Sequence, residues 1–135
     1  PEMRNALAPA VFLEKAHNNE TIEIHGDGKQ TRTMTYVDDI VSGICSAINN
    51  NYQCEIFNLG NSRSEKLMDM ISFLEKAVGK KAKIEFKEMQ PGDVKKTFAE
   101  IKRSEKYLNY KPKVHLDKGI PKFIKWYKSY LNEIK

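Results

Sequence analysis

Apolar residues recur along this chain at two spacings, which predict helices alternating with short strands. Residues 6–17 repeat apolar side chains three and four positions apart, as one face of an amphipathic helix does. Residues 21–25, Thr-Ile-Glu-Ile-His, alternate instead with the period of two that is typical of a half-buried strand. A second short strand is predicted over residues 82–86. Further helices are predicted over residues 40–48, 62–78, 101–108 and 117–131.

The segment QCEIFNL, residues 53–59, is almost continuously apolar around Ile56 and Phe57. Such a run is typical of a strand buried on both faces, as in a parallel sheet covered by helices. Strands that alternate with helices predict an α/β architecture. A chain of 135 residues is expected to form one domain, or a piece of a larger one.

Several residues are predicted to mark helix ends. Asp38 or Asp39 can accept the free backbone N–H groups of the helix that follows. Ser62 and Glu65 have the spacing of a capping box, which predicts that the next helix begins there. Gly79 stands in the usual position after a helix and is expected to close it.

Composition indicates a globular protein with a reduced interior. The chain is 40% hydrophobic, but no apolar run approaches the roughly 20 residues that cross a bilayer, and no secretory signal opens the sequence. Cys45 and Cys54 lack metal-ligand spacing, and Cys45 stands among apolar neighbours, so we expect a buried thiol and a cytoplasmic location. Trp126, at helical spacing from Phe123 and Tyr130, is predicted to lie in the core.

The net charge is +5, and lysines are scattered through the C-terminal half. One interpretation is a solvated basic surface. The other is attraction to an anionic partner, either nucleic acid or a phosphorylated small molecule. Charge alone does not choose between them.

The stretch after the first strand carries two candidate ligand-binding features. Gly26-Asp27-Gly28 begins like a dinucleotide fingerprint, but Thr31 stands where the third glycine belongs, so a turn is predicted. Arg32 follows this turn and should project from the edge of the sheet, where α/β proteins hold ligands. Its planar fork of donors suits phosphate oxygens, although from the residues alone an ordinary surface arginine is favoured.

The residues alone predict no complete catalytic set and no metal site. Tyr107 and Lys111 spell Tyr-x-x-x-Lys, but Asn109 and Pro112 end the helix that should carry both side chains on one face. The adjacent pair at 38–39 is more typical of helix caps than of acid/base chemistry. The three histidines have no spacing that would bind a metal together.

Five segments carry a family resemblance: NALAPAVF, IEIHGDGKQTRTMTYVDDIVSGI, EIFNLGNSR, LEKAVGKKAKIEFKEMQPGDVKKTFAEIKRSEKYLNYKPKV and GIPKFIKWYKSYL. In this order they resemble the C-terminal third of the extended short-chain dehydrogenase/reductase family, with the UDP-glucuronate 4-epimerases as the most similar subgroup. The resemblance implies an α/β, nucleotide-sugar-binding region of an NAD(P)-binding Rossmann-like enzyme, without the N-terminal Rossmann domain. Residues 1–135 would form a single unit that includes the last helix and strand of the cofactor-domain sheet, at about 38–60.

The enzymes of that subgroup invert a sugar hydroxyl by transferring a hydride to tightly held NAD and back. Their glycine fingerprint and catalytic Tyr-x-x-x-Lys lie in the N-terminal two-thirds, which has no counterpart here. The resemblance therefore implies that this chain binds a UDP-sugar, UDP-glucuronate or UDP-galacturonate, and is inactive alone. It implies no catalytic residue and no cofactor site on the chain, with NAD belonging to the complete enzyme.

The resemblance also assigns binding roles by position. Arg32 is similar to the arginine that grips the diphosphate, and Asp93, in the QPGD loop, to the aspartate that holds the ribose hydroxyls. Ile24 and His25 correspond to the strand whose backbone and side chain frame the uracil. The chemistry agrees, because an arginine suits the charge of a diphosphate and a carboxylate accepts from two hydroxyls.

Further positions match less closely. Asn5 and Leu7 correspond to the start of the helix beside the nucleotide. Gln90 stands where many relatives place a second phosphate-binding arginine, and Thr33-Met34 replaces the family's usual Asp-Phe. The loss of that carboxylate is expected to affect affinity more than fold.

Two other interpretations remain open at this stage. A basic interaction module that binds an acidic partner or nucleic acid would need its lysines to converge on one face, and their scatter argues against it. A non-catalytic assembly unit would dock onto a separate cofactor-binding subunit. In either case the 53–59 segment, if left without its sheet, is expected to repack internally or to pair with a second copy.

Overall fold

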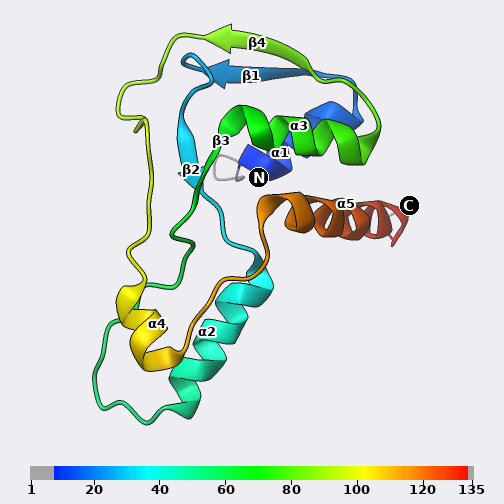
Figure 1. Ribbon diagram of the computed structural model, residues 1–135. Coiled ribbons are helices and arrows are strands. Elements are labelled where there is room, and N and C mark those ends of the chain that lie inside the picture. Colours follow the sequence, from blue (N-terminus) through cyan, green and yellow to red (C-terminus); the bar gives the residue numbers. More distant parts are fainter. Residues whose placement is uncertain (1–7, 134–135) are drawn as a thin grey trace.

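The computed structural model describes residues 8–133 and shows an α/β chain in two units (Figure 1). The helices and strands, in order, are α1 (Ala8–His17), β1 (Thr21–His25), β2 (Thr31–Thr33), α2 (Val37–Asn49), β3 (Ser64–Lys66), α3 (Leu67–Val78), β4 (Lys83–Lys87), α4 (Lys102–Leu108) and α5 (Leu116–Glu133). Within the described residues, β1 pairs with β4 in parallel and β2 with β3 antiparallel.

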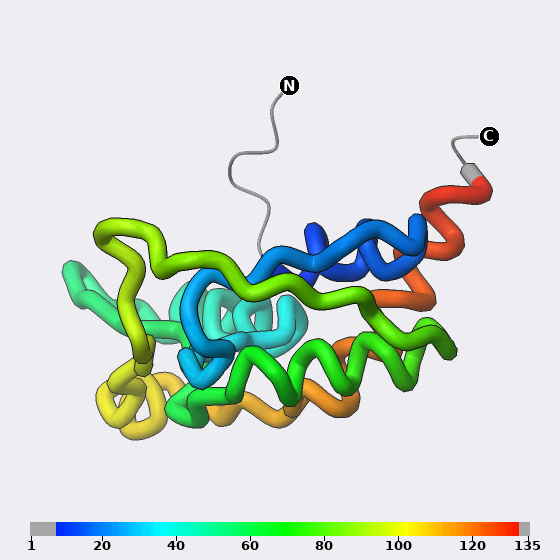
Figure 2. Tube along the Cα trace, turned by 90° about the horizontal axis from the view of Figure 1, so that it is seen from above, coloured from blue at the N-terminus to red at the C-terminus, as the bar shows by residue number. Residues whose placement is uncertain are grey.

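The upper unit comprises α1, β1, α3, β4 and α5. Figure 2 shows β1 and β4 side by side above the helices, with Ile22 of β1 opposite Ile84 of β4. The alternation of β1 works as predicted, because Ile22 and Ile24 are buried while Thr21 and Glu23 are exposed. The two isoleucines join one core cluster with Met70 and Leu74 of α3 and with residues of α1 and α5.

The lower unit comprises α2, α4 and the segments 50–60 and 109–115. Its core is small and consists of Ile101, Leu108 and Tyr110. The Tyr110 hydroxyl donates to the Gly60 carbonyl at 2.9 Å. Burial, with the nearby Asp39 carboxylate, raises the pKa of Tyr110, so the phenol remains a hydrogen-bond donor at neutral pH.

The segment 53–59 does not form a strand in this structure, which corrects the prediction of a buried one. A strand needs a hydrogen-bonded neighbour, and none of the described residues supplies one here. The segment instead packs in part on α4: Phe57 and Leu59 contact the lower core, and Ser104 donates to the Asn58 carbonyl at 2.6 Å. Ile56, the centre of the apolar run, is 82% exposed.

Helix α2 begins three residues earlier than predicted, at Val37, and the two aspartates do not cap it. Both lie in its first turn, and Tyr36 occupies the cap position without a side-chain hydrogen bond. Asp39 is buried and instead accepts the Val114 N–H at 2.9 Å. It therefore ties α2 to the segment that leads into α5.

Cys45 and Trp126 are exposed, which corrects the prediction that both are buried. Cys45 is exposed because the buried face of α2 is the one that carries Asp39 and Gly43, and Cys45 does not lie on it. Trp126 lies outside the core face of α5 and stacks between Phe123 and Tyr130, with ring centroids 5.9 and 5.5 Å away.

The capping box is also wrong. Residues 64–66 form β3, and α3 begins only at Leu67, because β3 pairs with β2 in the register Arg32 opposite Glu65. The other end of α3 is as predicted: Gly79 closes it in the left-handed conformation, with φ of 79°.

Candidate functional site

A cavity of about 560 Å³ lies between α1, β1, the β1–β2 turn and the segment after β4. Five of the seven predicted site residues line it: Ile24, His25, Arg32, Gln90 and Asp93. The other two, Asn5 and Leu7, fall outside the described residues. The structure thus brings together side chains from distant parts of the sequence, since Ile24 and Asp93 are 69 positions apart.

Helix α1 contributes one continuous stripe to the wall. Ala8, Val11, Phe12 and Lys15 all line the cavity, and their spacing of three and four residues places them on one helical face. Over the seven steps from Ala8 to Lys15 the helix rises about 10 Å. The stripe therefore carries the cavity from an apolar end to a cationic one.

Strand β1 contributes Glu23, Ile24 and His25. Consecutive strand residues point to opposite faces of a sheet, so a cavity lined by all three follows the edge of the strand. Because the Gly26 N–H bonds to the Lys87 carbonyl of β4, the backbone groups of Ile24 face β4 and those of His25 face the other edge.

The turn between β1 and β2 sets the direction of Arg32. Gly26 and Gly28 have φ of 96° and 74°, a conformation that side chains other than glycine rarely adopt, which confirms the predicted turn. Gln30 is buried and donates to the His25 carbonyl at 2.5 Å, closing the turn. The chain then enters β2 rather than a helix.

Arg32 and Asp93 form the most direct polar contact in the cavity. One guanidinium nitrogen donates to a carboxylate oxygen of Asp93 at 2.6 Å, and the other donates to the Thr31 carbonyl at 3.0 Å. The two side chains are 25% and 32% exposed. Gly92, with φ of 84°, forms the turn that presents Asp93.

His25 is oriented by two neighbours on the segment after β4. Its Nδ1 lies 3.2 Å from the Glu88 carbonyl, which can only accept, so Nδ1 carries the proton. Its Nε2 then accepts from the Gln90 amide at 3.4 Å. Gln90 therefore positions the imidazole at the mouth of the cavity.

Lys15 and Glu23 were missed by the sequence reasoning, although both line the cavity. The available signal for Lys15 was its place at helical spacing from Val11 and Phe12, a charged end to an apolar stripe. Glu23 gave no signal, because an exposed glutamate in an alternating strand is the ordinary case.

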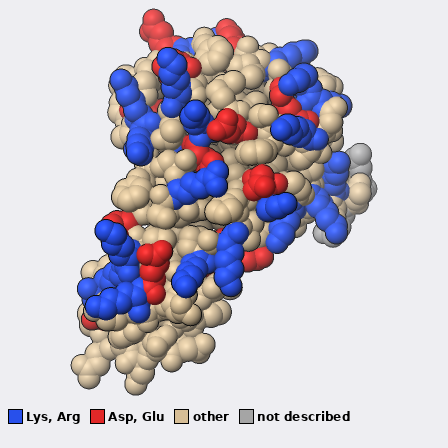
Figure 3. Space-filling view, in the orientation of Figure 1, with Lys and Arg blue, Asp and Glu red and all other residues tan. Residues whose placement is uncertain are grey.

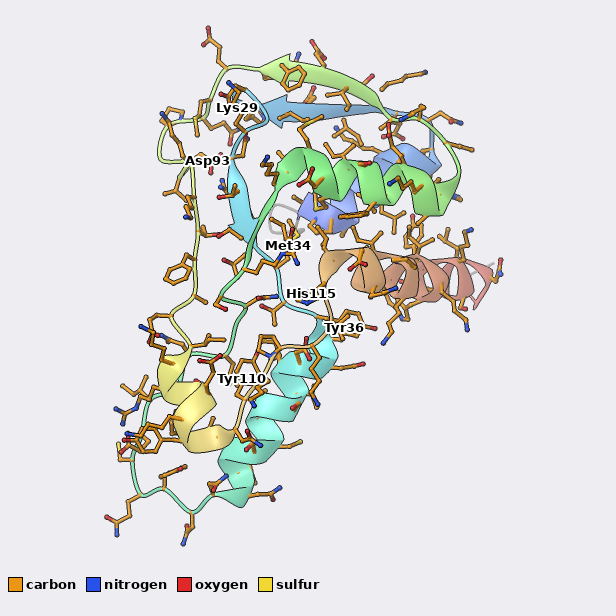
Figure 4. The ribbon with its side chains drawn as sticks, in the orientation of Figure 1. Lys29, Met34, Tyr36, Asp93, Tyr110 and His115 are labelled. Atoms are coloured by element: carbon orange, nitrogen blue, oxygen red, sulfur yellow. The ribbon has the colours of Figure 1, made fainter. Side chains whose placement is uncertain are left out.

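A second cavity, of about 330 Å³, is largely apolar and lies where α2 and α5 begin. Figure 4 shows Tyr36 and His115 at this junction, with Met34 nearby. Val37, which is 61% exposed, and Phe123 also line it. The cavity therefore lies beside the exposed first residue of α2.

The other candidate motifs do not form a site among the described residues. Asn109, with φ of 51°, ends α4 before Lys111, so Tyr107 and Lys111 do not share a helix. In the part of the chain that the structure describes, no cluster of His, Cys, Asp and Glu could hold a metal ion. Of the helices described, none has both the length and the apolar character to cross a bilayer.

Comparison with known proteins identifies the family. The family model described as GDP-mannose 4,6 dehydratase matches residues 3–123. An uncharacterized protein of Methanocaldococcus jannaschii is 47% identical over 124 residues, which cover 92% of this chain and 38% of that protein. A UDP-glucuronate 4-epimerase of Thermodesulfobacterium geofontis is 34% identical over 125 residues, with the same two coverages.

A solved structure agrees. The UDP-glucuronic acid 4-epimerase of Bacillus cereus, in complex with UDP-glucuronic acid and NAD, is 34% identical with a TM-score of 0.80, over 89% of this chain and 39% of that one. The chain thus spans about two-fifths of the length of the proteins that it matches. It belongs to the GDP-mannose 4,6-dehydratase family of short-chain dehydrogenase/reductase-type nucleotide-sugar epimerases and dehydratases, and corresponds to their C-terminal, α/β portion.

Proposed function

We propose that this chain binds the UDP portion of a UDP-sugar, with UDP-glucuronate or UDP-galacturonate as the expected ligand, and does not catalyse a reaction alone. The observation that carries the proposal is the convergence of Arg32, Asp93 and His25 from three segments on one cavity. Its volume, about 560 Å³, lies in the range of cavities that hold small ligands.

Each part of UDP has a chemically matched wall. The guanidinium of Arg32 suits the diphosphate, because a planar fork of donors meets two phosphate oxygens at once. The carboxylate of Asp93 suits the ribose hydroxyls as an acceptor. Strand β1 at Ile24 and His25 forms the wall that we assign to the uracil, and the imidazole offers it a flat surface.

The relatives support this assignment. The Bacillus cereus structure that resembles this chain holds UDP-glucuronic acid and NAD. This chain covers 39% of that one, so we propose the activity for the complete enzyme and not for this chain. The reaction that we propose for the complete enzyme is 4-epimerisation of the sugar.

The residues described do not fit NAD. A dinucleotide site needs a glycine-rich turn that opens a helix, so that the helix N-terminus meets the pyrophosphate. Here the Gly26–Gly28 turn leads into β2. We therefore propose that NAD is held by a separate cofactor-binding domain, and no chemical step is assigned to this chain.

The experiment is a proton–nitrogen NMR titration of the chain with UDP and UDP-glucuronic acid at low salt. We expect shifts at His25, Arg32 and Asp93 and a dissociation constant on the order of high micromolar to millimolar, because a few charge-assisted contacts must offset the cost of association. Arg32→Ala should weaken binding about tenfold, the usual worth of a hydrogen bond to a charged group.

Arg63→Ala is the matched control. Arg63 pairs with Glu65 and does not line the cavity, so its loss removes the same charge without touching the ligand. If Arg32→Ala and Arg63→Ala weakened UDP binding equally, the loss would be explained by net charge alone. Shifts that fail to localise around the cavity at millimolar UDP would refute the proposal.

We further propose that the cofactor-binding domain docks on the outer face of α2. Its exposed residues Val37, Val41, Ile44 and Ile48 follow helical spacing and form one apolar stripe, with Ile48 75% exposed. Ile56, on the 53–59 segment, is a further exposed apolar residue of the lower unit. An apolar stripe of this kind marks an interaction site, and the roughly three-fifths of each relative that this chain does not match supplies a candidate occupant.

Sedimentation of this chain with the separately produced N-terminal portion of the Bacillus cereus enzyme, whose solved structure holds NAD, tests the docking. We expect a complex with the native sequence and none with Ile44→Asp, because a carboxylate would be buried without a partner. Ser129→Asp, on the exposed side of α5, is the control and should leave the complex intact. Self-association through the same stripe would instead make a second copy the occupant.

A further inference from the structure

A third cavity, of about 500 Å³, lies between α3 and α5 and shares no lining residue with the cavity beside β1. Four apolar residues line it: Phe73 and Ala77 of α3, and Pro121 and Ile124 of α5. Three lysines and one aspartate complete the lining. We propose that this α3–α5 groove binds a small amphiphilic anion, a molecule with an apolar body and a carboxylate or phosphate head group.

The charged residues are divided between the two ends of the groove. Asp117 lies in the first turn of α5, whereas Lys125 and Lys128 lie further along the same helix, by about 12 and 16 Å. Helices α3 and α5 run in the same direction (Figure 1), and Lys76 stands in the last turn of α3. All three lysines therefore lie away from Asp117, at a basic end that suits the head group of an anion.

The ammonium groups at this end lie beside apolar surface. The Nζ of Lys76 is 5.8 Å from the centre of the Phe73 ring, and both residues line the groove. Among the described residues, no carboxylate forms an ion pair with Lys76, Lys125 or Lys128. Figure 3 shows several Lys and Arg side chains over α5 on the face in view. An anionic head group would accept charge-assisted hydrogen bonds here while its apolar body covers the ring.

Other occupants match the groove less well. A nucleic acid would neutralise the lysines but would leave the four apolar residues without an apolar partner. A second copy of this chain, packed on the groove about a twofold axis, would bring the same lysines together, and like charges repel. A neutral apolar ligand would desolvate the ammonium groups without pairing them. The volume, about 500 Å³, is in the range of sites for small ligands.

The test is a proton–nitrogen NMR titration of the whole chain with octyl phosphate, inorganic phosphate and octyl glucoside. Octyl phosphate should shift the amides around Lys76 and Lys125. It should bind at least tenfold more tightly than inorganic phosphate, because burial of two methylene groups is worth about that factor. It should also bind more tightly than octyl glucoside, which carries the same alkyl chain without a charge. Equal binding of either reference compound, or tighter binding of a single-stranded oligonucleotide at the groove, would overturn the proposal.

The double variant Lys125→Gln with Lys128→Gln removes two of the three ammonium groups. The affinity for octyl phosphate should fall about fivefold, the scale of exposed ion pairs. Lys118→Gln with Lys122→Gln is the matched control, because it removes the same charge from α5 at positions that do not line the groove, and it should leave the affinity unchanged. Unchanged spectra of β1 and β4 establish that each variant is folded. Equal weakening by the two double variants would assign the attraction to net charge and contradict a site in the groove.

Discussion

Leu74→Ala should lower the free energy of unfolding of the upper unit by about 2–5 kcal/mol, the range for removing a buried leucine from a well-packed core. Leu74 is 1% exposed and belongs to the cluster that joins α3 to β1, α1 and α5. The substitution removes apolar contact area and leaves a space that surrounding side chains fill only in part. For a small chain this is a large fraction of the total stability.

Denaturant unfolding followed by amide exchange is the appropriate measurement, because it reports each unit separately. Leu74→Met is the matched control and should cost less than about 1.5 kcal/mol, since it conserves volume. Protection should fall in β1, β4 and α3 while the amides of α2 and α4 change little. Equal loss of protection in both units would show that they unfold together.

The upper unit was the more predictable part of the fold because its side chains bury one another. The apolar residues that alternate in 21–25 and those that form the stripe of α3 pack against each other within this chain. The strand at 64–66 carried no such signal, because it is polar and exists only by pairing with β2. Local periodicity cannot report a strand whose stability comes from its neighbour.

The prediction of a buried strand in the lower unit failed for a different reason. An apolar pattern predicts that a surface is covered, but it does not identify the segment or protein that covers it. Residues 53–59 and the stripe of α2 have the composition of buried elements, yet Ile56 and Ile48 are exposed among the described residues. Their pattern agrees with the proposed docking of a further domain rather than with packing inside this chain.

The candidate site shows the same limit. The contact between Arg32 and Asp93 joins positions 61 apart, which no spacing rule could pair. The family resemblance assigns a role to each residue, and their direct contact is visible only in the structure. Lys15 and Glu23 needed the fold itself, because only the packing of α1 against β1 makes them neighbours of the cavity.

Gly43→Val should destabilise the lower unit by about 3 kcal/mol, at the upper end of the usual cost of overpacking. A side chain at this position would place its Cβ 2.6 Å from one Leu59 methyl and 2.9 Å from the Tyr110 ring. In an exposed helix the loss of a glycine is normally favourable by up to about 1 kcal/mol. The clash should reverse that sign, because Tyr110 is buried and held by its bond to Gly60.

Ser42→Val isolates the steric part of the effect, since it puts the same residue on the exposed side of the same helix. Amide exchange should show loss of protection in α2 and α4 for the Gly43 variant alone. Adding Leu59→Ala makes room for the new side chain, so the double variant should recover part of the loss, and the cycle measures the coupling directly. Full additivity would mean that α2 does not pack against the 53–59 segment in solution.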